Sequence, residues 1–158
     1  MFAAAFLYIR EFYRPRLSSY AACRRHYDVM PLPELHAEAA WLLGAETRPL
    51  PLMLILPRCC ALFYEFLERA TCEPRINDEQ RRLAVRAAID AKEEILRRCP
   101  TKLVPEIEEL LAKHCAKVRR MGRFPKAADL VRDSRKDFRG SFSAARRVLI
   151  HPGSARMQ

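Results

Sequence analysis

Apolar residues recur every three or four positions in three stretches of the chain, a spacing typical of helices that bury one face. The stretches cover residues 57–73, 77–98 and 105–122. The first has the clearest apolar face, which consists of Cys59, Leu62, Phe63, Phe66, Leu67 and Ala70. The pattern predicts an all-α fold in which the three helices form an antiparallel bundle over residues 57–122.

Residues typical of helix ends support the same three helices. Pro57 stands at the expected start of the first helix, where a proline is tolerated because first-turn N–H groups have no partner within the helix. Asn77 precedes the second helix and Gln80 follows three residues later, the spacing of a capping box, while Gly122 follows the third helix. We therefore expect the proline-rich segment 45–56 to be a connector that lies in a groove.

Weaker helical patterns flank the bundle. Residues 2–13, continued by 17–27, form one candidate helix, and residues 33–43 form another; both are expected to be peripheral. Residues 126–139 have a helical but mostly polar pattern, so this segment is not expected to fold by itself. The chain divides into N-terminal helices with a connector (1–56), the bundle (57–122) and a basic C-terminal extension (123–158).

Positive charge is concentrated at the C-terminal end. The chain has 29 Lys and Arg against 19 Asp and Glu, and residues 119–158 hold eleven basic and three acidic residues. Such a segment favours a polyanion, an acidic protein or anionic lipid, although a merely solubilising tail is the alternative. Together with two phenylalanines, its basic side chains are suited to docking on a protein or stacking on RNA bases; they are Arg132, Arg135, Lys136, Arg139, Arg146 and Arg147.

No catalytic signature is recognisable in the sequence. His114 is alone on an apolar helix face, where packing is the usual role of histidine. The consecutive pairs 93–94 and 108–109 are glutamates that diverge around their helices and are expected to face solvent. The six cysteines show no Cys-x-x-Cys spacing, so we expect reduced, buried thiols and no zinc site. The sequence therefore does not predict an enzyme, a metal site or a directly bound cofactor.

Residues 59–123 resemble the mitochondrial LYR-motif (complex I LYR-like) family of small three-helix proteins. The resemblance begins at Ala-Leu-Phe-Tyr-Glu-Phe-Leu (61–67), where the family has Leu-Tyr-Arg and then a leucine. It continues at Arg-Arg-Leu-Ala-Val-Arg (81–86) and Ile-Asp-Ala (89–91), then at Pro-Glu-Ile-Glu-Glu-Leu-Leu (105–111) and the arginines at 119–120. Tyr64 stands at the position of the family arginine, and Lys92 at that of a phenylalanine.

The resemblance implies a role in binding other proteins. Members of the family are non-catalytic accessory subunits, assembly factors or adaptors, and many bind the mitochondrial acyl carrier protein, whose acylated phosphopantetheine inserts between the helices. The implied contacts to that carrier are Leu62, Phe63, Tyr64, Arg81 and Arg86, and the implied acyl groove is lined by Leu67, Ala84, Ala88 and Leu111. One stripe of the second helix consists of Ala84, Ala88, Ala91 and Ile95 and is here called the alanine stripe. From the residues alone, it has two interpretations, which are close helix packing, the more frequent case, and space for a slender ligand.

We therefore expect a structural accessory subunit of a mitochondrial respiratory-chain complex, with complex I as the first candidate. It would lie on the matrix side of the inner membrane, without a transmembrane segment of its own. Residues 1–10, which are apolar, contain one arginine and lack acidic residues, resemble the start of a mitochondrial presequence. The expected partners are other subunits of the complex and the acyl carrier protein. The alternative is a mitochondrial ribosomal protein that binds rRNA through its basic C-terminal arm.

Overall fold

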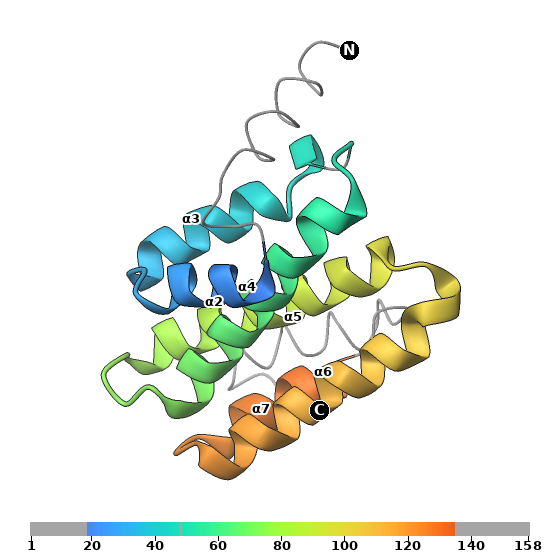
Figure 1. Cartoon of the computed structure of the whole chain (residues 1–158). Helices are drawn as coiled ribbons and strands as arrows, with labels where there is room; N and C mark the ends of the chain where they lie inside the picture. The colour runs from blue at the N-terminus through green and yellow to red at the C-terminus, as the bar shows by residue number, and fades with distance from the viewer. Residues whose placement is uncertain (1–18, 48, 135–158) are drawn as a thin grey trace, which may run out of the picture.

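The computed structural model describes residues 19–47 and 49–134, and all the regular structure in this part of the chain is helical (Figure 1). The elements are α2 (Tyr20–Asp28), α3 (Leu32–Leu42), η2 (Ala45–Thr47), α4 (Leu52–Cys72), α5 (Asp78–Arg98), η3 (Thr101–Leu103), α6 (Val104–Met121) and α7 (Pro125–Asp133). The predicted all-α class is confirmed. Among these described helices, none has both the length and the apolar character needed to cross a membrane.

The α4 and α5 helices form the centre of the fold and pack against each other along their lengths. The apolar face predicted for α4 is buried, and Leu62, Phe63 and Phe66 are all fully enclosed. Burial of such a side chain contributes about 1.5–3 kcal/mol, so this face provides much of the driving force for folding. The predicted capping box of α5 is also confirmed, because the Asn77 side chain accepts from the Gln80 N–H at 2.8 Å and the Gln80 side chain accepts from the Asn77 N–H at 2.9 Å.

The start of α4 differs from the sequence prediction. The helix begins at Leu52, so Pro57 lies inside it and residues 52–56 are not a connector. Pro57 has no N–H to donate to the carbonyl of Met53. Met53 is 89% exposed, so water can donate to that carbonyl. Ile55 is fully buried, and its burial stabilises the additional helical turn before Pro57. The helix therefore continues through the proline instead of starting at it.

The helices α2 and α3 are part of the core, which corrects the expectation that they are peripheral; the helix predicted over residues 2–13 lies outside the described residues. Both α2 and α3 pack on α4. Cys23, Tyr27, Leu35 and Leu42 from these helices are fully buried. The core therefore includes residues on both sides of the boundary predicted at residue 56, and α2 and α3 belong to the same hydrophobic core as α4.

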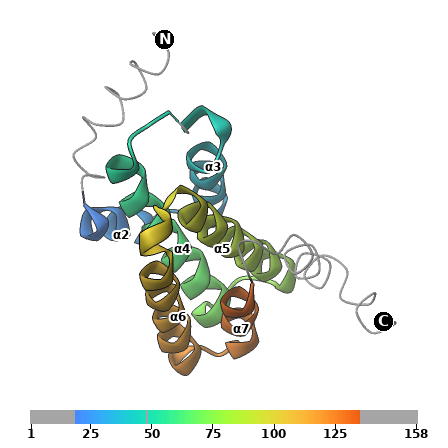
Figure 2. The ribbon, with the colours of Figure 1, turned by 90° about the vertical axis from the view of Figure 1, so that its right-hand side faces the viewer.

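A simple three-helix arrangement over residues 57–122 is not confirmed. The α5 and α6 helices diverge, and α7 lies between them, in contact with α4, α5 and α6 (Figure 2). Ala127, Ala128 and Val131 of α7 are buried in the common core. The polar segment after Gly122 thus folds by packing on the other helices.

The close approach of the α6–α7 loop to α4 gives a first testable prediction. A Cβ added to Gly122 would lie 2.6 Å from the carbonyl oxygen of Thr71 and closer still to its methyl group. We expect Gly122→Ala to lower the free energy of unfolding by about 1–3 kcal/mol, measured by urea denaturation. In the control, Gly44→Ala, the closest atom is the end of the Glu46 side chain, which can move, so the expected loss is smaller. Equal losses in the two variants would contradict this interpretation.

Candidate functional site

The residues that the resemblance assigns to carrier binding are mostly inside the protein. Leu62 and Phe63 are fully buried, and Tyr64 is 9% exposed. The four residues of the implied acyl groove, Leu67, Ala84, Ala88 and Leu111, are brought together in the same buried core. For the alanine stripe on α5, the structure therefore agrees with close helix packing.

Arg81 points into the fold and binds the end of α4. Its Nη1 donates to the carbonyl oxygens of Ala70 at 2.9 Å and Glu73 at 3.0 Å, and its Nη2 donates to that of Ile76 at 3.2 Å. Its guanidinium also stacks on the ring of Phe124, 3.4 Å from the centroid. Burial lowers the pKa of Arg81. A contact with a carrier protein, which the resemblance implies for Arg81, would need an outward-facing guanidinium, whereas most of the donors of Arg81 are used within the fold.

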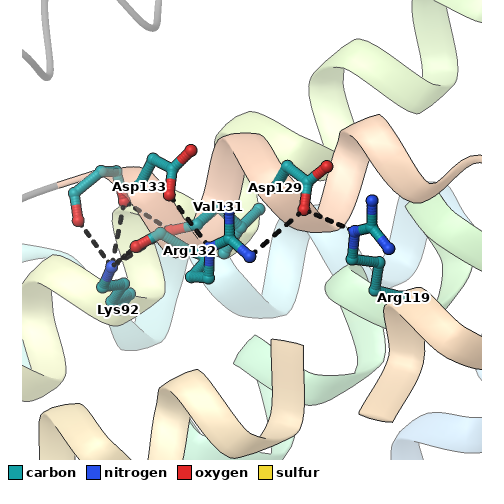
Figure 3. Close-up of polar contacts among 7 residues, drawn as sticks. Lys92, Arg119, Asp129, Val131, Arg132 and Asp133 are labelled. Atoms are coloured by element: carbon teal, nitrogen blue, oxygen red, sulfur yellow. Dashed lines mark hydrogen bonds and ion pairs between the residues drawn. The ribbon is translucent and has the colours of Figure 1, made fainter. Parts of the chain in front are cut away.

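Lys92 holds the C-terminal end of α7 (Figure 3). Its Nζ donates to the carbonyl oxygens of Val131 at 3.1 Å, Arg132 at 3.0 Å and Ser134 at 2.5 Å. The last carbonyls of a helix have no partners within the helix and carry the negative end of its dipole, so a cation is favourable there. The lysine at the position of the family phenylalanine therefore fixes α7 in place.

Arg132 is the one member of the predicted basic arm that lies in the described part of the chain. It is exposed, and it pairs with Asp133 at 3.0 Å and Asp129 at 3.5 Å. Asp129 also accepts from Arg119 of α6 at 2.8 Å, which links α7 to α6 (Figure 3). The other predicted members lie outside the described residues; they are Arg135, Lys136, Arg139, Arg146 and Arg147.

A groove of about 520 Å³, here called the basic groove, lies between the first half of α5 and α7. Val85, Phe124, Ala127 and Leu130 provide its apolar surface. Its polar lining consists of Asp78, Arg81, Arg82, Arg123 and Lys126. Sequence analysis missed Arg82, Arg123 and Lys126 as site residues, because the groove exists only once α7 has packed beside α5.

A second groove of about 470 Å³, here called the acidic groove, lies between α3 and the second half of α5. Its lining consists of His36, Ala39, Ala40, Leu43, Ala87, Asp90, Glu93, Glu94 and Arg97. Glu94 is 3% exposed and pairs with both Arg97 and Arg98. The expectation that residue 94 faces solvent is therefore wrong, and this carboxylate is part of the fold.

Asp90 and Glu93 differ from Glu94, because neither makes a hydrogen bond or ion pair within the described part of the chain. Burial raises the pKa of the Asp90 carboxyl from 3.8 to about 6, with the charge of Arg86 opposing the rise and that of Glu93 adding to it. Nε2 of His36 is buried without a hydrogen-bond partner, and burial lowers the pKa of this histidine. The acidic groove therefore has two carboxylates without a hydrogen-bond partner among the described residues.

The remaining residues with reactive side chains are His114, which packs against an aromatic ring, and the cysteines, whose thiols stay protonated. His114 packs against Tyr64 with ring centroids 5.2 Å apart. All six cysteines are free, and burial raises the pKa of Cys59 to about 12 and that of Cys115 to about 11, so these thiols are weak nucleophiles at neutral pH. In the described ranges, no group of three or more His, Cys, Asp or Glu side chains is placed to hold a metal ion.

Comparison with protein-family models, with curated proteins and with solved structures finds no match to this chain. The likeness to the LYR-motif family therefore rests on the sequence segments quoted above. Both grooves have linings of mixed apolar and charged side chains, which suits them to binding.

The unpaired Asp90 gives a prediction about pH. A carboxyl whose folded pKa is about 6 binds more protons in the folded than in the unfolded state between about pH 4 and 6, so stability falls as the pH rises through that window. Asp90→Asn should raise the free energy of unfolding at pH 7 by about 1 kcal/mol. This is less than the ~3 kcal/mol implied by the whole pKa shift, because the side chain is partly exposed to solvent.

The measurement is urea denaturation at pH 7 and at pH 4. The gain from Asp90→Asn should disappear at pH 4, where the wild-type carboxyl is protonated in the folded state. Glu79→Gln removes the same charge at an exposed position in the first turn of the same helix, where the helix dipole favours a carboxylate by about 0.3–1 kcal/mol, so this control should lower the stability slightly at pH 7 and not raise it. A gain of equal size at both pH values, or a loss at pH 7, would contradict the prediction.

Proposed function

We propose that the chain is a non-catalytic structural accessory subunit of a mitochondrial respiratory-chain assembly, with complex I as the first candidate, on the matrix side of the inner membrane. The observation that best supports this function is the basic groove between α5 and α7. The groove has an apolar floor, formed by Val85, Phe124, Ala127 and Leu130, and a cationic rim, formed by Arg82, Arg123 and Lys126. This combination suits an acidic amphipathic segment of another subunit. The mitochondrial context of the proposal comes from the likeness of residues 59–123 to the LYR-motif family.

The charges of the basic groove favour an anionic partner. Arg82, Arg123 and Lys126 provide three cations at its edge, against the single carboxylate of Asp78. Cations at the edge of an interface accelerate association and select the sign of the partner, while the apolar floor contributes most of the affinity. A helix that places its apolar face on the floor and its carboxylates at the rim would satisfy both parts of the groove.

The acyl carrier protein is the specific partner that the resemblance implies. Leu62, Phe63 and the residues of the implied acyl groove are buried and are not accessible to a partner. The remaining implied contacts are the two basic residues. Arg81 is engaged by the fold, whereas Arg86 makes no hydrogen bond within the described part of the chain. We therefore propose that the acidic surface of the carrier meets Arg86 and the rim of the basic groove, with its acyl-phosphopantetheine as a group of the partner and not of this chain.

Charge reversal at the rim tests the proposed function. Arg82→Glu with Lys126→Glu should abolish migration of the chain with a mitochondrial membrane complex in native gels. The matched control is Lys113→Glu with Lys117→Glu, an equal charge change at exposed positions of α6 outside both grooves. The control should migrate as the wild type does, and circular dichroism should show equal helicity for both variants.

Three outcomes would overturn parts of the proposal. Equal loss of migration in both variants would show that net charge, and not the groove, holds the chain in the complex. Co-sedimentation with ribosomal particles that is lost after RNase treatment would support the rRNA-binding alternative. Intact-complex mass spectrometry that finds no phosphopantetheine-bearing protein beside the chain would remove the acyl carrier protein as its partner.

A further inference from the structure

Helix α6 has a row of apolar side chains that the neighbouring helices leave open to solvent. Leu103, just before the helix, Leu110 and Met121 are 44%, 45% and 64% exposed. Ile107 and His114 lie between them and are half-buried. Successive members of this set are three, four or seven residues apart, so all five lie on one side of the helix. They are here called the α6 stripe.

The α6 stripe differs from the other apolar side chains at the surface. The remaining large hydrophobic side chains that are exposed in the described part of the chain are scattered over α2, α4 and α5; they are Tyr20, Val29, Met53 and Leu83. Single exposed apolar residues are normal, whereas a contiguous row of them marks an interaction surface. Helix α6 lies at the edge of the ribbon, with α7 along one side (Figure 2), so the α6 stripe is placed to meet a partner.

The charges of α6 are divided along its length. The first half has no basic residue, and its acidic residues are Glu106, Glu108 and Glu109. The second half has no acidic residue, and its basic residues are Lys113, Lys117, Arg119 and Arg120. The helix dipole favours this order within the first and last turns, whereas Glu109 and Lys113 lie in the middle of the helix. The face of α6 is therefore complementary in charge to the same face turned end to end.

We propose that the α6 stripe binds the α6 stripe of a second copy of this chain, with the two helices antiparallel. A symmetric dimer needs a surface that is complementary to itself, in which one residue meets a second and that second residue meets the first. When the two helices meet at the level of Ala112, Leu103 of one copy lies opposite Met121 of the other. In the same register, Leu110 lies opposite His114. The exposed apolar side chains of both copies are then covered.

The charged side chains beside the α6 stripe fit this register. Glu106 and Lys117 are both exposed, and in the antiparallel dimer Glu106 of one copy lies opposite Lys117 of the other. Glu109 lies opposite Lys113 in the same way. A parallel pair would place each of these residues beside its own counterpart, and like charges opposite each other are unfavourable. The charges thus select the antiparallel orientation.

Sedimentation equilibrium of the full chain tests this inference. The wild type should change from monomer to dimer between about 5 and 500 µM, because a single pair of helices forms a small interface. Leu110→Glu should raise the dissociation constant at least tenfold. The matched control is Leu83→Glu, the same change at a leucine of α5 that is exposed to a similar extent, and it should leave the dissociation constant within twofold of the wild type.

Charge swaps at low ionic strength test the antiparallel orientation. Glu106→Lys places two lysines opposite each other at both ends of the dimer, and Lys117→Glu places two glutamates there. Each variant alone should have a dissociation constant at least fivefold higher than the wild type. An equimolar mixture of the two variants should recover the affinity, because every pair then has opposite charges. A general loss of monomer stability would not be reversed by mixing.

Three results would overturn the inference. These are a monomer over the whole concentration range, equal weakening by Leu110→Glu and Leu83→Glu, or no recovery in the mixture of the charge variants. The proposed function does not depend on this dimer. Lys113→Glu with Lys117→Glu should lose the dimer and still migrate with the membrane complex, so failure of one proposal is distinguishable from failure of the other.

Discussion

The C-terminal ends of three helices are held by cations that project from a neighbouring helix. Arg69 of α4 donates to three carbonyl oxygens at or just after the end of α2, and Lys92 of α5 donates to three at the end of α7. Arg81 of α5 donates to two carbonyl oxygens at the end of α4 and to a third, that of Ile76, in the loop that follows. Carbonyls at the end of a helix generally lack partners within the helix, and leaving one buried without a hydrogen bond costs about 1–3 kcal/mol. The positions of α2, α4 and α7 therefore depend on these three side chains.

The basic groove depends on the same contacts. Lys92 and Arg81 lie on α5, and they hold α7 and the loop before it against that helix. The floor of the basic groove includes Phe124, on which Arg81 stacks, so this cation helps to position the floor. The acidic groove uses the other part of α5, where Glu94 is satisfied internally and Asp90 is not. Helix α5 thus contributes side chains both to the core of the fold and to the linings of the two grooves.

Much of the helical structure was predictable from the sequence, whereas the roles of its charged residues were not. Periodicity identified α5 and α6, and the capping box at Asn77 fixed the start of α5 because capping is a local interaction. The start of α4 was missed because the burial of Ile55 outweighs the local preference of Pro57 for a helix start. Arg81 and its neighbour in the sequence, Arg82, are chemically identical and both line the basic groove, but only Arg81 also donates hydrogen bonds to carbonyl oxygens of the described residues. That difference depends on the position of α7, which no local pattern specifies.

The most direct test of the account compares Arg81 with Arg86, the two arginines of α5 that the family resemblance treats alike. The free energy of unfolding should be measured by urea denaturation for Arg81→Met and Arg86→Met, two changes that remove the same charge and keep a long apolar stem. The account predicts a loss of about 2–3 kcal/mol for Arg81→Met, because hydrogen bonds from a charged donor to buried carbonyls are removed, and a loss within about 0.5 kcal/mol for Arg86→Met. Small and equal losses would contradict the claim that inward-pointing cations hold the helices in place.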